Sequence, residues 1–157
     1  MCTLKEDIKE SSQWIVKAFK ADGILLDYSI ESFIGIDKFF NKHSSNGKAR
    51  SRSRLSVNLG PILFSIAAYI GETIIKVAPG SVWITDDNDP EGELNVSLKL
   101  PDGAIIFPTQ RVMKRFKNGQ EDSIYVYGHT ITEVFTHQVF DENYWEQMKP
   151  KPWWKLW

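Results

Sequence analysis

The chain has 157 residues, an apolar share of 42% and a net charge of -1, which is typical of one globular domain with its own core. A charge so close to zero excludes a general electrostatic affinity for nucleic acid. The single cysteine, Cys2, excludes an internal disulfide, and the N-terminal sequence MCTLKEDIKESSQ lacks the apolar segment of a secretory signal. We therefore expect a cytoplasmic protein.

Two amphipathic helices are predicted at the start of the chain. Thr3 and Glu6 have the spacing of a capping box, and the apolar residues that follow at helical intervals predict a helix over about 4–21. Ser29 is a suitable N-cap for a second helix over about 30–42. The predicted buried face of this second helix consists of Ile30, Phe33, Ile34, Asp37 and Phe40.

A basic segment without apolar periodicity follows these helices. Residues 44–56, SSNGKARSRSRLS, predict a loop. From Lys38 to Arg54 the chain has six cations and no acid, which is typical of a solvated loop, with contact to phosphate or an acidic partner as the alternative. In that alternative, Arg50, Arg52 and Arg54 bind the partner.

The most apolar stretch of the chain is GPILFSIAAYIGETIIKV at residues 60–77, which predicts a central helix over about 61–77. A membrane span needs about 20 apolar residues. Here Glu72 and Lys76 follow the uninterrupted apolar run, so the stretch favours a buried core helix over a membrane span.

Gly71 and Glu72 are unusual residues for such an apolar helix. A glycine inside a helix costs about 1 kcal/mol relative to alanine, which is tolerable where a neighbouring backbone or aromatic ring approaches closely. A carboxylate beside so much apolar surface needs a charged hydrogen-bond partner. We predict a structural ion pair between Glu72 and Arg111 or Arg115, because arginine offers a bidentate contact.

The spacing of the apolar residues changes after this helix from that of a helix to that of strands. The runs SVWITDD, ELNVSLKL and AIIFP, separated by DNDPEG and a Pro-Asp-Gly turn, predict a three-stranded antiparallel meander packed against the helices. A short helix is predicted over about 110–117, with Thr109 as its N-cap. Residues 121–138 combine the composition of a strand with the spacing of a helix, and we predict a helix.

The expected fold is therefore α+β, with one domain over residues 1–149 and a Pro/Trp-rich tail over 150–157. The prolines keep this tail from continuing a helix. We expect Trp153, Trp154 and Trp157 to bind a partner protein. Docking of the tail on its own domain and a weak contact with a membrane interface are the alternatives left open.

No motif for a cofactor, a metal or a nucleophile is present in the sequence, and we expect none of these groups to be bound or used. Glu72 and Asp122 could act as general acid and base if the fold brought both into one cleft. A small hydrolase-like enzyme is therefore the alternative function.

Several segments resemble a known family when taken in order over about residues 25–127. They are LDYSIESFIGIDKFF, AAYIGETI, SVWI, LPDG and RVMKRFKNGQEDSIYVY. This order resembles a family of small bacterial cytoplasmic domains without an assigned biochemical function, and related layouts occur among immunity-type proteins. The resemblance implies an α+β fold and supplies no catalytic residue. We predict a non-enzymatic, immunity-like domain that acts by protein–protein contact.

Overall fold

The computed structural model describes residues 3–149 and shows an α+β protein that is 61% helical over this range. The α-helices are α1 Leu4–Ala21, α2 Phe33–His43, α3 Leu59–Val77, α4 Gly92–Asn95, α5 Pro108–Asn118, α6 Ile124–Thr136 and α7 Tyr144–Met148. Single 3-10 turns are η1 Ile30–Ser32, η2 Arg54–Ser56 and η3 Gln120–Asp122. The strands are β1 Ser44–Ser45, β2 Lys48–Ala49, β3 Val82–Ile84, β4 Ser97–Lys99 and β5 Ile105–Ile106.

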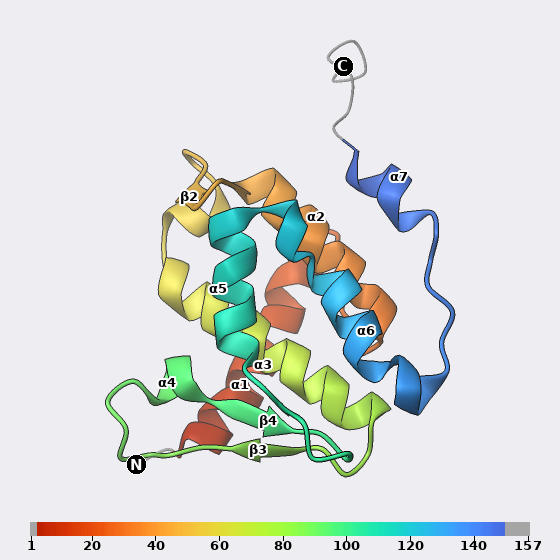
Figure 1. Ribbon diagram of the computed structural model, residues 1–157. Helices are drawn as coiled ribbons and strands as arrows, with labels where there is room; N and C mark the ends of the chain where they lie inside the picture. Colours follow the sequence, from red (N-terminus) through yellow and green to blue (C-terminus); the bar gives the residue numbers. More distant parts are fainter. Residues whose placement is uncertain (1–2, 150–157) are drawn as a thin grey trace.

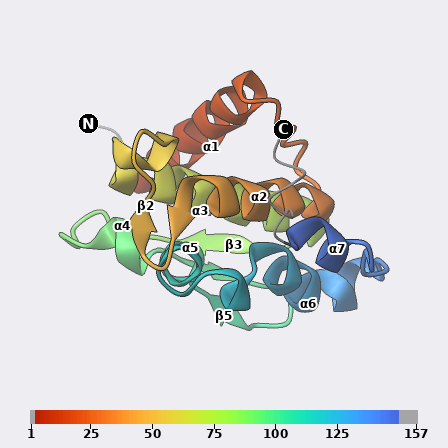
Figure 2. The same cartoon turned by 90° about the horizontal axis from the view of Figure 1, so that it is seen from above.

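Helix α3 lies at the centre of the molecule and contacts α1, α5 and α6 (Figures 1 and 2). By length and composition this helix could cross a membrane, but 67% of its most apolar window is buried inside the fold. The apolar run is therefore explained by burial on several sides, and the described structure supports no membrane span.

A three-stranded antiparallel sheet lies along one side of the helices, with the order β3-β4-β5 (Figure 1). Trp83 of β3 pairs with Leu98 of β4, which in turn pairs with Ile106 of β5. Because side chains alternate across a strand, these three residues share one face of the sheet. Leu98 is fully buried in the core, and Trp83 and Ile106 pack against it.

The indole of Trp83 explains both unusual residues of helix α3. A Cβ atom placed on Gly71 would lie 2.0 Å from Cη2 of Trp83, so the glycine is needed for the close approach of an aromatic ring. The indole Nε1–H of Trp83 donates to Oε2 of Glu72 at 3.4 Å. One side chain from the sheet thus occupies the space above Gly71 and gives Glu72 a hydrogen-bond partner.

The N-terminus of α1 forms the predicted capping box and holds a distant loop. The Thr3 hydroxyl accepts from the backbone N–H of Glu6, and the Glu6 carboxylate accepts from the N–H of Thr3. The next N–H, from Leu4, donates to Oδ1 of Asp87 at 2.7 Å. This bond holds the acidic loop of residues 86–93 beside the first turn of α1.

Residues 44–56 contain more structure than the loop predicted for them. Strands β1 and β2 form a short hairpin, and Leu55 is buried in the core with 1% of its surface exposed. The Arg54 guanidinium donates two hydrogen bonds to the carboxylate of Asp22, at 2.7 and 3.0 Å. One buried leucine and one bidentate ion pair therefore anchor a segment whose composition is otherwise typical of a solvated loop.

Two later helices also differ from their predicted bounds. Helix α5 begins at Pro108, which has no backbone N–H to satisfy and suits a first helical position, so Thr109 lies inside the helix and is not its N-cap. The helix predicted over 121–138 is α6, and the Ser123 hydroxyl caps it by accepting from the N–H of Val126. Helix α7 was not predicted from the sequence.

His43 makes the stability of the basic segment dependent on pH. Burial, assisted by the charge of Lys42, lowers the pKa of His43 below its usual value. Its Nδ1 accepts the backbone N–H of Arg54 at 3.2 Å, which only an unprotonated ring nitrogen can do. The unfolded chain therefore takes up a proton first as the pH falls through about 6.5.

We expect the free energy of unfolding to decrease below that pH, until the folded protein is protonated as well. The variant His43→Asn keeps an acceptor near the position of Nδ1 and has no charge to gain. Urea unfolding at several pH values should show a weaker pH dependence for this variant than for the natural protein. An equal pH dependence of the free energy of unfolding in the two proteins would show that His43 does not contribute to it.

Candidate binding site

A cavity of about 450 Å³ lies where α1, α3, α4 and α5 meet. This volume is within the usual range for sites that bind small ligands or side chains. Much of its wall is apolar and is formed by Pro61, Leu63, Phe64, Leu94 and Met113. Leu94 and Met113 are also exposed at the surface, by 39% and 42%. The apolar lining therefore continues from the cavity to the outside of the molecule.

Three carboxylates line the same cavity: Asp7 and Glu10 from α1 and Glu93 from α4. No Lys, Arg or His side chain is part of the lining formed by residues 3–149. Within the same range, no ion pair or side-chain hydrogen bond involves any of the three carboxylates. The site thus combines an apolar wall with a concentration of negative charge.

Thr109, at the edge of the cavity, carries an unsatisfied hydroxyl group. Thr109 lines the cavity from the first turn of α5 and has only 4% of its surface exposed. Its Oγ1 is buried and has no hydrogen-bond partner among the described residues. A buried polar group without a partner costs about 1–3 kcal/mol. Because Oγ1 is itself inaccessible to solvent, this cost belongs to the folded protein and does not identify a ligand.

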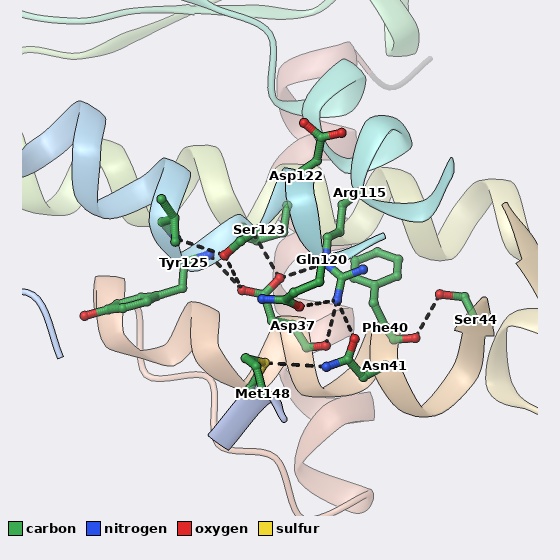
Figure 3. A network of polar contacts seen from close by, with 12 residues as sticks. Asp37, Phe40, Asn41, Ser44, Arg115, Gln120, Asp122, Ser123, Tyr125 and Met148 are labelled. Carbon is green, nitrogen blue, oxygen red and sulfur yellow. Dashed lines mark hydrogen bonds and ion pairs between the residues drawn. The ribbon is translucent and has the colours of Figure 1, made fainter. Parts of the chain in front are cut away.

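A second polar cluster is centred on Asp37 of α2, which is fully buried (Figure 3). Oδ1 accepts from Nε of Arg115 and from the N–H of Ile124, at 2.9 and 3.0 Å. Oδ2 accepts from the Ser123 hydroxyl, the N–H of Tyr125 and the Tyr144 hydroxyl, at 3.0, 3.0 and 2.9 Å. Five donors from three segments of the chain therefore surround one carboxylate.

Arg115 and Tyr144 make further hydrogen bonds in this cluster. Arg115, which is 2% exposed, donates to the backbone oxygen of Asp37, to Asn41 and to Gln120 (Figure 3). Burial and the charge of Asp37 raise the pKa of Tyr144, so its hydroxyl keeps the proton that it donates. The cluster joins α2, α5, α6 and α7 through hydrogen bonds to a buried ion pair, which indicates a structural role.

The ion pair predicted between Glu72 and Arg111 or Arg115 is not formed. Arg111 pairs with Asp122 at 3.0 Å, and Arg115 pairs with Asp37 at 2.9 Å. The physical reason lies in burial: Asp37 is fully buried and requires a countercharge. Glu72 is only partly buried, keeps access to water, and accepts from the indole of Trp83.

The structure does not gather the other predicted site residues into the cavity. Asp122 is bound by Arg111 and by the Asn118 amide, and neither Asp122 nor Glu72 lines the cavity. Arg54 is paired with Asp22, and Arg50 donates from Nε to the backbone oxygen of Ser44. Arg52 lies in an exposed turn.

The predicted partner-binding tryptophans Trp153, Trp154 and Trp157 lie outside the described residues. A role of Arg50, Arg52 and Arg54 in partner binding stays a prediction. Among residues 3–149, no three His, Cys, Asp or Glu side chains are arranged to hold one metal ion.

The cavity itself was missed by the sequence analysis, because its lining comes from four separate segments. Asp7 and Glu10 are spaced as neighbours on a helix, next to the buried stripe of α1. This spacing is the feature of the sequence that could have indicated the site. However, carboxylates are common in the first turns of helices because they interact favourably with the helix dipole. Nothing in the sequence indicated that Glu93 and Thr109 would face them.

No family model matches this chain, and comparisons with curated proteins and with solved structures found no match. The resemblance to small bacterial cytoplasmic domains therefore stays a prediction.

Proposed function

We propose that this protein is a non-enzymatic binding domain, and that it acts by protein–protein contact through the cavity between α1, α3, α4 and α5. The observation that carries the proposal is the apolar lining, which continues to the surface at Leu94 and Met113. Exposed apolar surface that continues into a concave site is typical of a place where another molecule docks. A cytoplasmic, immunity-like role is the form of this function that the sequence resemblance suggests.

The alternative function, a small hydrolase-like enzyme, has less support. It requires Glu72 and Asp122 to converge in one cleft, with one acting as acid and the other as base. Asp122 is engaged by an arginine and an amide, and Glu72 by an indole. Neither side chain lines the cavity described above.

Filling the cavity should prevent binding without disturbing the fold. Gly60 lines the cavity, a Cβ atom there would meet nothing within 4 Å, and its φ lies outside the left-handed region. The first atom of a side chain at this position therefore meets no clash, and Gly60→Trp is designed to place a large ring at the site. The matched control is Gln13→Trp, which adds the same ring at an exposed position of α1 outside the cavity.

Each of the three proteins would be immobilised and exposed to an extract of the cells that produce it, and bound proteins would be quantified by mass spectrometry. We expect a specific partner to be retained by the natural protein and by Gln13→Trp. Its recovery on Gly60→Trp should fall by about ten-fold or more, which corresponds to a loss of about 1.4 kcal/mol in binding free energy. Equal recovery of every retained protein on all three would contradict the proposal.

A further inference from the structure

We propose that the segment received by the cavity is cationic and amphipathic, with lysine or arginine next to aromatic or aliphatic side chains. This inference rests on the proposed function of the cavity and specifies the chemistry of the partner. It follows from two properties of the site: the sign of its charge, and the size and polarity of its wall.

The charge of the lining has one sign. Asp7, Glu10 and Glu93 contribute three carboxylates to the cavity, and no cationic side chain from residues 3–149 lines it. A concave site with low-dielectric walls concentrates the field of such charges. A cationic segment is attracted to this field, and an anionic one is repelled from it.

The surroundings of the cavity strengthen this field. Residues 86–93, DDNDPEGE, contain five acids and no cation. The bond from the N–H of Leu4 to Asp87 holds this loop beside the N-terminus of α1. Lys5 and Lys9 of α1 do not line the cavity. The acids of this loop add to the attraction of the cavity for a basic partner.

The apolar wall excludes a simple cation as the whole ligand. A volume of about 450 Å³, walled by side chains such as Leu63, Phe64 and Met113, is far larger than one ammonium group needs. An apolar body beside the charge would fill this space and remove apolar surface from water. The cavity therefore requires both a positive charge and an apolar group. A segment in which a basic residue has an aromatic or aliphatic neighbour supplies both.

The test uses the full-length protein and three synthetic peptides with blocked ends. Their sequences are Lys-Phe-Leu-Phe-Lys, Gln-Phe-Leu-Phe-Gln and Glu-Phe-Leu-Phe-Glu, so only the charge differs. Binding is followed by NMR shifts of backbone amides at peptide concentrations up to about 5 mM, a range in which weak association is measurable. We expect the lysine peptide to bind at least about ten-fold more tightly than the glutamate peptide. This preference should shrink as the ionic strength rises from about 0.02 to about 0.2 M.

Two triple variants with the same change in net charge locate the effect. Asp7→Asn, Glu10→Gln and Glu93→Gln together should abolish the preference for the lysine peptide. The control combines Glu31→Gln, Glu121→Gln and Glu142→Gln, three exposed positions outside the cavity, and should keep the preference. Urea unfolding of both variants checks that the fold is retained.

The outcomes separate the two proposals. If the glutamine or glutamate peptide binds as tightly as the lysine peptide, and Gly60→Trp abolishes that binding, the cavity is the docking site and the cationic requirement is wrong. If no peptide binds, or if binding is unaffected by Gly60→Trp, both this inference and the proposed function of the cavity are contradicted.

Discussion

Replacing Asp37 with asparagine is expected to lower the free energy of unfolding by about 3–5 kcal/mol, as is typical when one partner of a buried ion pair is removed. Arg115, only 2% exposed, would keep its charge without the carboxylate that neutralises it. The new amide nitrogen would also face a hydrogen-bond donor on at least one side, because both oxygens of Asp37 accept hydrogen bonds. Since domains are stable by only about 5–15 kcal/mol, the loss is severe.

The more exposed pair of Asp122 and Arg111 provides a matched control. These side chains have 21% and 27% of their surface exposed and are 3.0 Å apart. Asp122→Asn makes the same chemical change at this position, and we expect a loss of at most about 1 kcal/mol. Both variants would be compared with the natural protein by urea unfolding. Similar losses in the two would show that burial does not set the strength of the Asp37 cluster.

A smaller change in the same cluster tests its hydrogen bonds while the ion pair between Asp37 and Arg115 is kept. Tyr144→Phe removes a hydroxyl that donates to Asp37 and accepts from the Gln120 amide. The expected loss is about 1–3 kcal/mol, because a buried partner is left unsatisfied. This variant also reports on the cluster if Asp37→Asn does not fold.

Gly71→Ala is expected to destabilise the protein by about 1–3 kcal/mol, although alanine is the better helix former by about 1 kcal/mol. The reason is the 2.0 Å distance between the new Cβ atom and Cη2 of Trp83. Either the ring or helix α3 must move, and the indole would then lose its hydrogen bond to Glu72. Urea unfolding measures the loss, and the indole N–H resonance of Trp83 reports the displacement.

The same helix offers a control in which the sign of the effect reverses. Gly60→Ala introduces a methyl group that meets nothing within 4 Å, so this variant should be neutral or more stable by up to about 1 kcal/mol. In a Trp83→Leu background, Gly71→Ala should lose most of its cost because the ring is absent. If Gly71→Ala is harmless in the natural background, the close packing of Trp83 on α3 is not a source of stability.

Much of the fold could be predicted from local sequence patterns. The bounds of α1 followed from its capping box and apolar spacing, and the run around Gly71 indicated a core helix with an aromatic ring or backbone close to it. Asp37 was placed on the buried face of its helix by spacing alone. These features depend on residues within a few positions of one another, and the sequence by itself therefore determined them.

The partners of the polar residues were decided only by the tertiary structure. Arg115 binds Asp37 at a separation of 78 residues, and the prediction that it would bind Glu72 failed because nothing local distinguishes one carboxylate from another. The cavity likewise joins Asp7, Glu93 and Thr109 from three separate helices. Contacts between distant segments depend on how the helices pack and on which groups lose access to water, and the spacing of residues along one chain records neither.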